Sequence, residues 1–176
     1  TGDTGLPALS QLTAGGVGFA AMMGYHEVSV IKVPKVVVLV TGNELITPGE
    51  VLQKGQIYES NSFTIQAALQ QMGISNCELV RLPDTLPATI KALDNALNSA
   101  DFVFTSGGIS VGDYDFAGEA FKQLGVDTLF YKVKQKPGKP IYYGKKENCF
   151  VYGLPGNLAS ALTGFYEYAY PALKAS

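Results

Sequence analysis

The sequence predicts an α/β fold, with a mostly parallel sheet that carries helices on both faces. Three observations favour this class. Strand-like and helix-like segments alternate from Lys35 onward, the run "VVVLV" at 36–40 is unbroken and β-branched, and 47% of residues are hydrophobic with 20 glycines. An unbroken apolar run is typical of a strand that is buried on both faces.

The first 34 residues differ in pattern from the remainder of the chain. Residues 6–23 read as a helix of small residues, although the pair Gly15–Gly16 weakens it. Residues 26–33 alternate like a short strand, and Pro34 then separates this helix and strand from the next segment. We therefore treat 1–34 as a preface from an adjoining domain and 35–176 as the main domain.

The main domain is predicted to contain the regular alternation. A helix at 60–73 has Ser60 or Asn61 as its N-cap and Gly73 as its stop. The remaining segments are predicted as strands at 35–41, 77–82, 101–106, 126–133, 140–144 and 149–154, and as helices at 85–100, 115–125 and 156–173.

Composition excludes several function classes. Thirteen basic against fifteen acidic residues give a net charge of −2, which favours neither nucleic acid nor an anionic membrane as partner. No apolar run is long enough for a membrane span, and no signal peptide is visible, so we expect a cytoplasmic protein. The spacing of Cys77 and Cys149 suits neither a zinc site nor a disulfide framework, and His26 is expected at the surface. The chain begins with Thr1, which suggests a fragment of a larger protein or a processed chain.

Polar residues follow the predicted strands at their carboxyl ends. These ends share one edge of a parallel sheet, where ligands bind near the reversal of strand order. The loops that return from helices to strands carry only routine turn residues. The polar sets, in strand order, are "TGNEL" with Glu44, "PD" with Asp84, "TSGGISVGDYD" with Asp113 and Asp115, "KQKPGKP" with its lysines, and "LPGN".

The segment "TSGGIS" predicts a loop that approaches an anion closely. Gly107 and Gly108 let backbone amides face a ligand, and Ser106 and Ser110 can donate hydrogen bonds to it. A tight turn that needs glycine only for its shape remains an equal alternative. Neither a Walker-type loop nor a full dinucleotide fingerprint is present.

The carboxylates Glu44, Asp84 and Asp115 suggest a magnesium site if they converge beside that anion site. Taken singly, each is more simply a helix cap or a solvated loop carboxylate. "LPGN" places backbone amides at the start of the last helix, which suggests a second anion-binding site. The alternative is that this segment is a plain exposed turn.

The lysine loop follows the strand at 126–133. Alternation puts Lys132, Lys134 and Lys136 on one side for as long as that strand persists. Pro137 and Pro140 stiffen the loop, which suits fixed positive charge against an oxyanion. A solvated basic loop is the alternative.

Taken together, "TGNEL", "SNS", "TSGGISVGDYDF", "KPGKP" and "GLPGN" resemble the molybdopterin-binding domain of molybdenum cofactor synthesis proteins. The resemblance runs from Lys35 to Ser176 and is strongest to the molybdopterin molybdotransferases of the MoeA type, to which the E domain of gephyrin is similar. It implies a three-layer α/β/α fold like that of MogA and MoaB. It also implies an enzyme that inserts molybdate into adenylylated molybdopterin with release of AMP and with Mg²⁺ present, as a homodimer when full-length.

The resemblance assigns roles to individual positions. The catalytic set is Glu44, Asp84, Asp115, Lys132 and Lys136, with Glu44 and Asp115 at the metal. The substrate-binding set is Thr41, Asn61, Ser106, Gly107, Gly108, Ser110, Gly112, Lys139, Pro155, Gly156 and Asn157. In the family, a domain of the dimer mate completes the site, so this chain is expected to be catalytically incomplete.

One departure and three rivals accompany this assignment. Leu158 stands where the family often has a second proline after "LPGN", so the end of that loop is expected to differ. The rivals are a molybdopterin adenylyltransferase on the same fold, a binding or scaffold module, and the nucleotide-processing relative in competence- and damage-associated proteins. The preface and "KQKPGKP" favour the molybdotransferase over the first, and "SGGIS" argues against the last.

Overall fold

The computed structural model describes residues 3–109 and 116–176 of the chain, which divides into two compact units, Thr1–Lys32 and Val33–Ser176. The assignment of residues 1–34 to an adjoining domain stays a prediction. Among the described residues, no helix is both long and apolar enough to cross a membrane.

The first unit contains one helix, α1 (Ala14–Met22), which is shorter than the predicted helix over 6–23. Thr13 is extended and its Oγ1 accepts a hydrogen bond from the amide of Gly16 at 3.2 Å, so the helix begins after Thr13 and not at residue 6. The strand predicted over 26–33 is also wrong. These residues are mostly exposed, and no described segment pairs with their backbone; an alternating pattern without a partner does not form a strand. His26 is exposed, as expected.

The second unit is built on a six-stranded sheet with the order β4-β1-β5-β8-β7-β6. Four neighbouring strands are parallel, β7 is antiparallel to both its neighbours, and β6 therefore points the same way as β8. The strands are β1 (Val36–Thr41), β4 (Cys77–Leu82), β5 (Phe102–Ser106), β6 (Asp127–Tyr131), β7 (Tyr142–Lys146) and β8 (Cys149–Leu154). The predicted mostly parallel sheet is confirmed.

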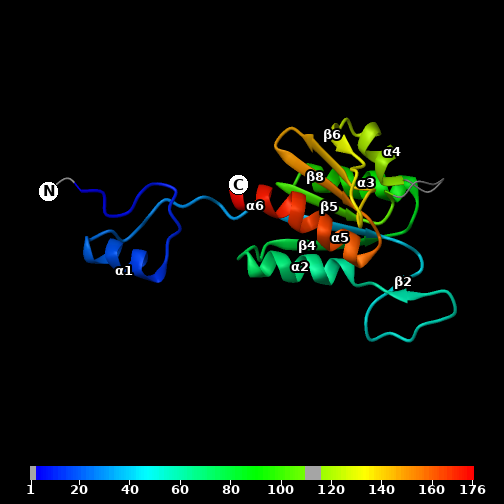
Figure 1. Ribbon diagram of the computed structural model, residues 1–176, viewed down its shortest axis with the longest axis horizontal. Helices are drawn as coiled ribbons and strands as arrows, with labels where there is room; N and C mark the ends of the chain where they lie inside the picture. The colour runs from blue at the N-terminus through cyan, green and yellow to red at the C-terminus, as the bar shows by residue number, and fades with distance from the viewer. Residues whose placement is uncertain (1–2, 110–115) are drawn as a thin grey trace. The chain divides into compact units, whose positions relative to one another are not determined.

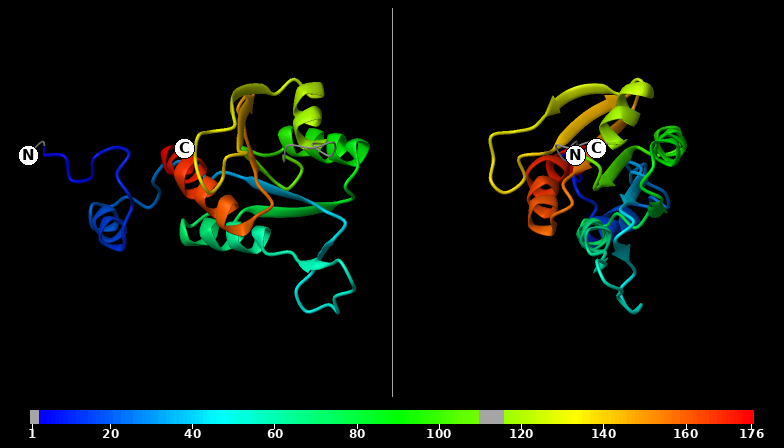
Figure 2. Two further views of the ribbon diagram at one scale, coloured as in Figure 1. Left: turned by 45° about the vertical axis from the view of Figure 1, so that its right-hand side comes forward. Right: turned by 90° about the vertical axis from the view of Figure 1, so that its right-hand side faces the viewer.

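Helices cover both faces of this sheet, which gives three layers (Figure 1; Figure 2, right). One face carries α2 (Asn61–Gln71) and the closing helix, and the other carries α3 (Leu86–Leu97) and α4 (Phe116–Gln123). The alternation of β1 supplies both cores. Val36, Val38 and Val40 pack in the first core, and Val37 and Leu39 pack in the second.

The strand order reverses between β1 and β5. The connection through α2 leads from β1 outward to β4, and the connection through α3 returns past β1 to β5. The loops that follow β1 and β5 therefore leave the sheet in opposite directions, and the space between their ends is the expected ligand position in such a fold.

The closing helix is continuous but irregular. It runs through α5 (Leu158–Gly164), a π-helical turn η1 (Phe165–Ala169) and α6 (Tyr170–Ala175). Two short strands, β2 (Leu45–Ile46) and β3 (Ile57–Tyr58), pair in parallel in a segment for which the sequence predicts neither a strand nor a helix. They lie at the base of the protruding loop in Figure 1. Two-residue strands are too short to show a periodic pattern.

The strand predicted over 126–133 is too long, so the condition for the alternation of Lys132, Lys134 and Lys136 is not met. Strand β6 ends at Tyr131, and Lys132 adopts a left-handed conformation with φ 62°, which turns the chain. The loop is instead closed by backbone hydrogen bonds from Lys132 to Ile141 and from Val133 to Lys139, at 2.9 and 3.0 Å. It follows β6 at the same edge of the sheet as the loops after β1, β4, β5 and β8.

Candidate functional site at the carboxyl edge of the sheet

The loop after β5 passes close to the end of β1 at the reversal of strand order. Gly107 has φ 87°, and a Cβ atom there would lie 3.0 Å from the carbonyl oxygen of Thr41 and 3.2 Å from its hydroxyl oxygen. Gly108 also has positive φ, at 68°. Glycine is required at position 107 because the backbone must pass Thr41 closely in a conformation that other residues rarely adopt.

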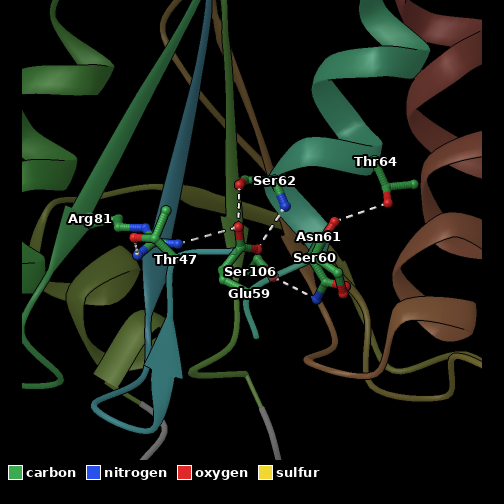
Figure 3. Close-up of polar contacts among 8 residues, drawn as sticks. All are labelled: Thr47, Glu59, Ser60, Asn61, Ser62, Thr64, Arg81 and Ser106. Atoms are coloured by element: carbon green, nitrogen blue, oxygen red, sulfur yellow. Dashed lines mark hydrogen bonds and ion pairs between the residues drawn. The ribbon is translucent and has the colours of Figure 1, made fainter. Parts of the chain in front are cut away.

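Asn61 links three segments at this edge. It is buried at the start of α2, and its Nδ2 donates to the hydroxyl oxygen of Ser106 at 2.8 Å (Figure 3). The same Nδ2 donates to the carbonyl oxygen of Gly156 at 2.9 Å. The first contact reaches the end of β5 and the second reaches the loop after β8. Because Ser106 accepts from Asn61, its own hydroxyl proton is left for another acceptor.

A pair of carboxylates lies at the ends of β1 and β4. Burial raises the pKa of the Asp84 carboxyl, and the nearby charge of Glu44 raises it further. The two loops are joined where the amide of Asp84 donates to the side-chain oxygen of Asn43 at 3.4 Å. Between these loops a cavity of about 340 Å³ is lined by Val40, Gly42, Asn43, Leu45, Arg81, Leu82 and Pro83.

The lysine loop packs against the closing helix. The hydroxyl of Tyr168 donates to Oε1 of Gln135 at 2.7 Å, and a Cβ atom at Gly138 would lie 3.4 Å from the carbonyl oxygen of Ser160. The side chains of Lys132, Lys134, Lys136 and Lys139 are exposed, and among the described residues none of them forms an ion pair. The ammonium of Lys132 lies 4.6 Å from the ring centroid of Tyr131.

The segment Pro155–Asn157 opens the closing helix. Asn157 is extended, and its Oδ1 accepts hydrogen bonds from the amide of Ser160 at 3.2 Å and from its hydroxyl at 3.3 Å. Pro155 is buried and Gly156 is exposed. The side chain of Asn157 thus serves as the N-cap, and Leu158 is the first residue of α5.

Ser110, Gly112, Asp113 and Asp115 lie outside the described residues, so their predicted roles stay predictions. Within residues 3–109 and 116–176, no group of three or more His, Cys, Asp or Glu side chains forms a metal cluster. The pair Glu44 and Asp84 still fits Mg²⁺, which is commonly held by one or two carboxylates with substrate phosphates and water as the other ligands.

A buried acidic residue beside this site was not predicted from the sequence. Glu59 is 2% exposed and lies next to Arg81 and Ser62. One signal was available, since "YESNS" places an acidic residue just before a helix start, where negative charge is favourable. The partner Arg81 comes from β4, and the sequence pattern does not relate it to Glu59.

Comparison with known proteins agrees with this geometry. A family model described as "Probable molybdopterin binding domain" matches residues 37–175. The chain belongs to this molybdopterin-binding domain family. The matched range contains the flanking helices, every described residue of the predicted site and all of the six-stranded sheet except Val36.

Relatives within the family cover the chain almost end to end. A molybdopterin molybdenumtransferase of Haemophilus influenzae is 41% identical over 172 residues, which are 98% of this chain and 42% of that protein. The chain therefore spans less than half the length of this relative.

Solved structures give the same picture of the fold. The MoeA protein of Pyrococcus horikoshii superposes with a TM-score of 0.77 at 29% identity, over 90% of this chain and 39% of that one. The Mog protein of Mycobacterium ulcerans superposes with a TM-score of 0.62 at 17% identity, over 82% of this chain and 97% of that one, and shows the fold alone. The expectation of a MogA- and MoaB-like three-layer fold is confirmed.

Proposed function

We propose that this chain is the molybdopterin-binding domain of a molybdotransferase, which inserts molybdate into adenylylated molybdopterin with release of AMP. The observation that carries the proposal is the carboxylate pair Glu44 and Asp84, which lies at the same sheet edge as the glycine loop at 107–108. A carboxylate pair beside an anion loop suits a metal-assisted reaction at a phosphate. The names of the relatives support the same assignment.

The glycine loop would bind the phosphate end of the substrate. The backbone at Gly107 and Gly108 has positive φ and no Cβ, so it can approach an anion closely. The loop begins at Ser106, which accepts a hydrogen bond from Asn61 and so keeps its own proton to donate. Thr41 and the segment 155–157 lie beside the same loop and would complete the phosphate-binding site.

Glu44 and Asp84 would hold Mg²⁺, with Asp115 proposed as a further ligand on the sequence alone. When bound, the ion supplies positive charge that offsets the phosphoanhydride oxygens. The role of Glu44 and Asp84 would be to present carboxylate oxygens to this ion. Burial and, secondly, the charge of Glu44 raise the pKa of Asp84, so a cation would bind more tightly as Asp84 loses its proton.

The exposed lysines would supply the charge that molybdate requires. Lys132, Lys136 and Lys139 lie in a loop that is braced by Gln135 and Tyr168. Because no described carboxylate pairs with these lysines, their charge stays available for an oxyanion. These lysines would lower the electrostatic repulsion between molybdate, which carries two negative charges, and the phosphates of the substrate.

The complete enzyme would need more than this chain. The chain spans 42% of the Haemophilus influenzae relative, so the homodimer and the catalysis of the whole protein are proposed for the longer protein and not for this domain by itself. Binding of the substrate is the property that we expect this domain to retain.

The experiment that tests the function follows two products in the longer protein that contains this domain. Incubation with adenylylated molybdopterin, molybdate and Mg²⁺ should release AMP and form molybdenum cofactor. Glu44→Gln and Asp84→Asn should each reduce AMP release at least about tenfold. The control Glu78→Gln, which removes the exposed partner of Lys35, should leave the rate unchanged. Consumption of ATP with free molybdopterin, without AMP release from the adenylylated form, would contradict the proposal and indicate an adenylyltransferase.

A further inference from the structure

Glu59 is a buried carboxylate that the proposed reaction does not use. Its side chain is 1% exposed, and both carboxylate oxygens accept hydrogen bonds from Ser62 (Figure 3). Oε1 accepts from the amide of Ser62 at 2.8 Å, and Oε2 accepts from the hydroxyl of Ser62. A carboxylate that is so completely enclosed has a defined orientation.

This carboxylate completes the start of α2. Ser60 is the N-cap of the helix, but its side chain accepts no hydrogen bond from the first turn. Glu59 instead satisfies the Ser62 amide, and its negative charge lies where the helix dipole favours it. The first turn of α2 is therefore held by Glu59, and Asn61 belongs to that turn.

Glu59 also joins α2 to two other segments. Its backbone amide donates to the carbonyl oxygen of Ile46 in β2 at 2.9 Å, and the Nη2 atom of Arg81 in β4 lies 3.7 Å from its Oε2. Arg81 in turn donates from Nη1 to the hydroxyl of Thr47 at 2.8 Å (Figure 3). Asn61 then extends the connection to Ser106 and Gly156.

A role in stability alone does not explain this arrangement well. Removing a carboxylate from water costs several kcal/mol, and a buried ion pair is often no more stable than an apolar replacement. Arg81 contacts Glu59 at 3.7 Å, which is longer than a strong charged hydrogen bond. The negative charge of Glu59 is instead needed to orient the first turn of α2. The contacts of Asn61 depend on that orientation.

We propose that Glu59 is a positioning residue for the molybdopterin site. It holds the first turn of α2 so that Asn61 joins the loop after β5 to the loop after β8, and Arg81 fixes Glu59 against β2 and β4. This inference rests on the proposed function, because it assigns Glu59 an effect on the binding of adenylylated molybdopterin. Glu59 acts through Asn61 and has no contact with the ligand.

A double-mutant cycle on this chain tests the proposal, with calorimetric titration of adenylylated molybdopterin as the measurement. Glu59→Gln and Asn61→Ala should each weaken binding about tenfold. Because both changes remove the same interaction, the double variant should bind no more than about twofold more weakly than Asn61→Ala. The control Glu78→Gln should bind like the unchanged chain. Losses that multiply to about a hundredfold, or a Glu59→Gln variant that binds normally, would overturn the inference.

A second measurement needs no ligand and separates this inference from the proposed function. In the free chain, the side-chain amide of the buried Asn61 donates to the buried hydroxyl of Ser106 and to the carbonyl oxygen of Gly156, so its protons should exchange slowly with water in NMR spectra. Glu59→Gln should speed this exchange at least about tenfold, and unchanged exchange would overturn the inference. If the unchanged chain binds no molybdopterin, the proposed function fails, and the exchange result still decides whether Glu59 positions Asn61.

Arg81→Gln replaces Glu59→Gln in both experiments if the latter does not fold. The Arg81 side chain is 36% exposed, so its loss is tolerated more easily than a change at Glu59. We expect a loss of about threefold in binding that disappears in the Asn61→Ala background. A loss of the same size in both backgrounds would overturn the role of the Glu59 and Arg81 pair.

Discussion

Asn61 and Ser106 are 45 positions apart in the chain, and the Nδ2 atom of Asn61 donates to the hydroxyl oxygen of Ser106 at 2.8 Å. The bond joins the start of α2 to the end of β5, across the point where the strand order reverses. A second bond from the same amide reaches Gly156. One side chain thus fixes two loops that the proposed function needs in register.

We expect Asn61→Ala to lower the free energy of unfolding by about 1–3 kcal/mol, since the buried hydroxyl of Ser106 and the carbonyl oxygen of Gly156 both lose their donor. The measurement is urea denaturation. Asn98→Ala is the matched control, because the Nδ2 of Asn98 also donates to two oxygens but at an exposed position. Its cost should stay within about 0.5 kcal/mol. Equal losses for the two variants would contradict the buried role of Asn61.

Gly107→Ala should destabilise the chain more than Gly73→Ala. Both glycines have positive φ, at 87° and 80°, so each alanine bears a conformational cost of about 1–2 kcal/mol. At Gly73 a Cβ atom meets nothing within 4 Å, whereas at Gly107 it meets Thr41 at 3.0 Å. We therefore expect a further loss of about 1–3 kcal/mol at Gly107, measured by denaturation in parallel. Equal stability of the two variants would show that the loop after β5 does not pass Thr41 as described.

Glu44→Gln should lower the pKa of Asp84 without restoring its ordinary value. Burial is the larger cause of the raised pKa and persists in the variant, whereas the repulsion from Glu44 disappears. A carboxyl group with a raised folded-state pKa contributes most to stability below its unfolded pKa of about 4, and that contribution is lost as the pH rises through the folded pKa. Side-chain carbon NMR titration measures the shift, and an unchanged Asp84 pKa would place the two carboxylates too far apart to share a cation.

Lys136→Ala should increase the concentration of molybdate that the longer protein needs to form the cofactor. Losing one exposed positive charge at the sheet edge should raise the molybdate concentration for half-maximal rate about tenfold, less at high salt. Lys145→Ala is the control, because Lys145 lies near the far end of β7, over the ring of Phe150. Similar effects of the two substitutions would argue for a general charge effect and against a molybdate site in the loop 132–141.

Much of the fold can be predicted from local patterns. The run Val36–Val40 alternates between two cores, so its unbroken apolar character correctly predicts a central strand with helices on both faces. Gly107 and Gly108 predict either a close approach to an anion or a turn that needs glycine for its shape. The close passage of Gly107 beside Thr41 agrees with the second reading, and the approach to an anion stays a prediction.

The features that the sequence could not supply are tertiary in origin. The left-handed conformation of Lys132 ends β6 earlier than its alternation predicts. The pairing of Glu59 with Arg81 joins elements whose proximity depends on the register of β4 beside β1. The strand expected at 26–33 fails for the same reason, since a periodic pattern does not provide a partner strand.

Calorimetric titration of this chain with adenylylated molybdopterin, with and without Mg²⁺, is the decisive test of the proposed site. We predict saturable binding that is tighter with Mg²⁺, and that loses its dependence on Mg²⁺ in Glu44→Gln and Asp84→Asn. The absence of binding by the folded chain, or binding that is indifferent to Mg²⁺ and to both carboxylates, would show that this edge of the sheet is not the site.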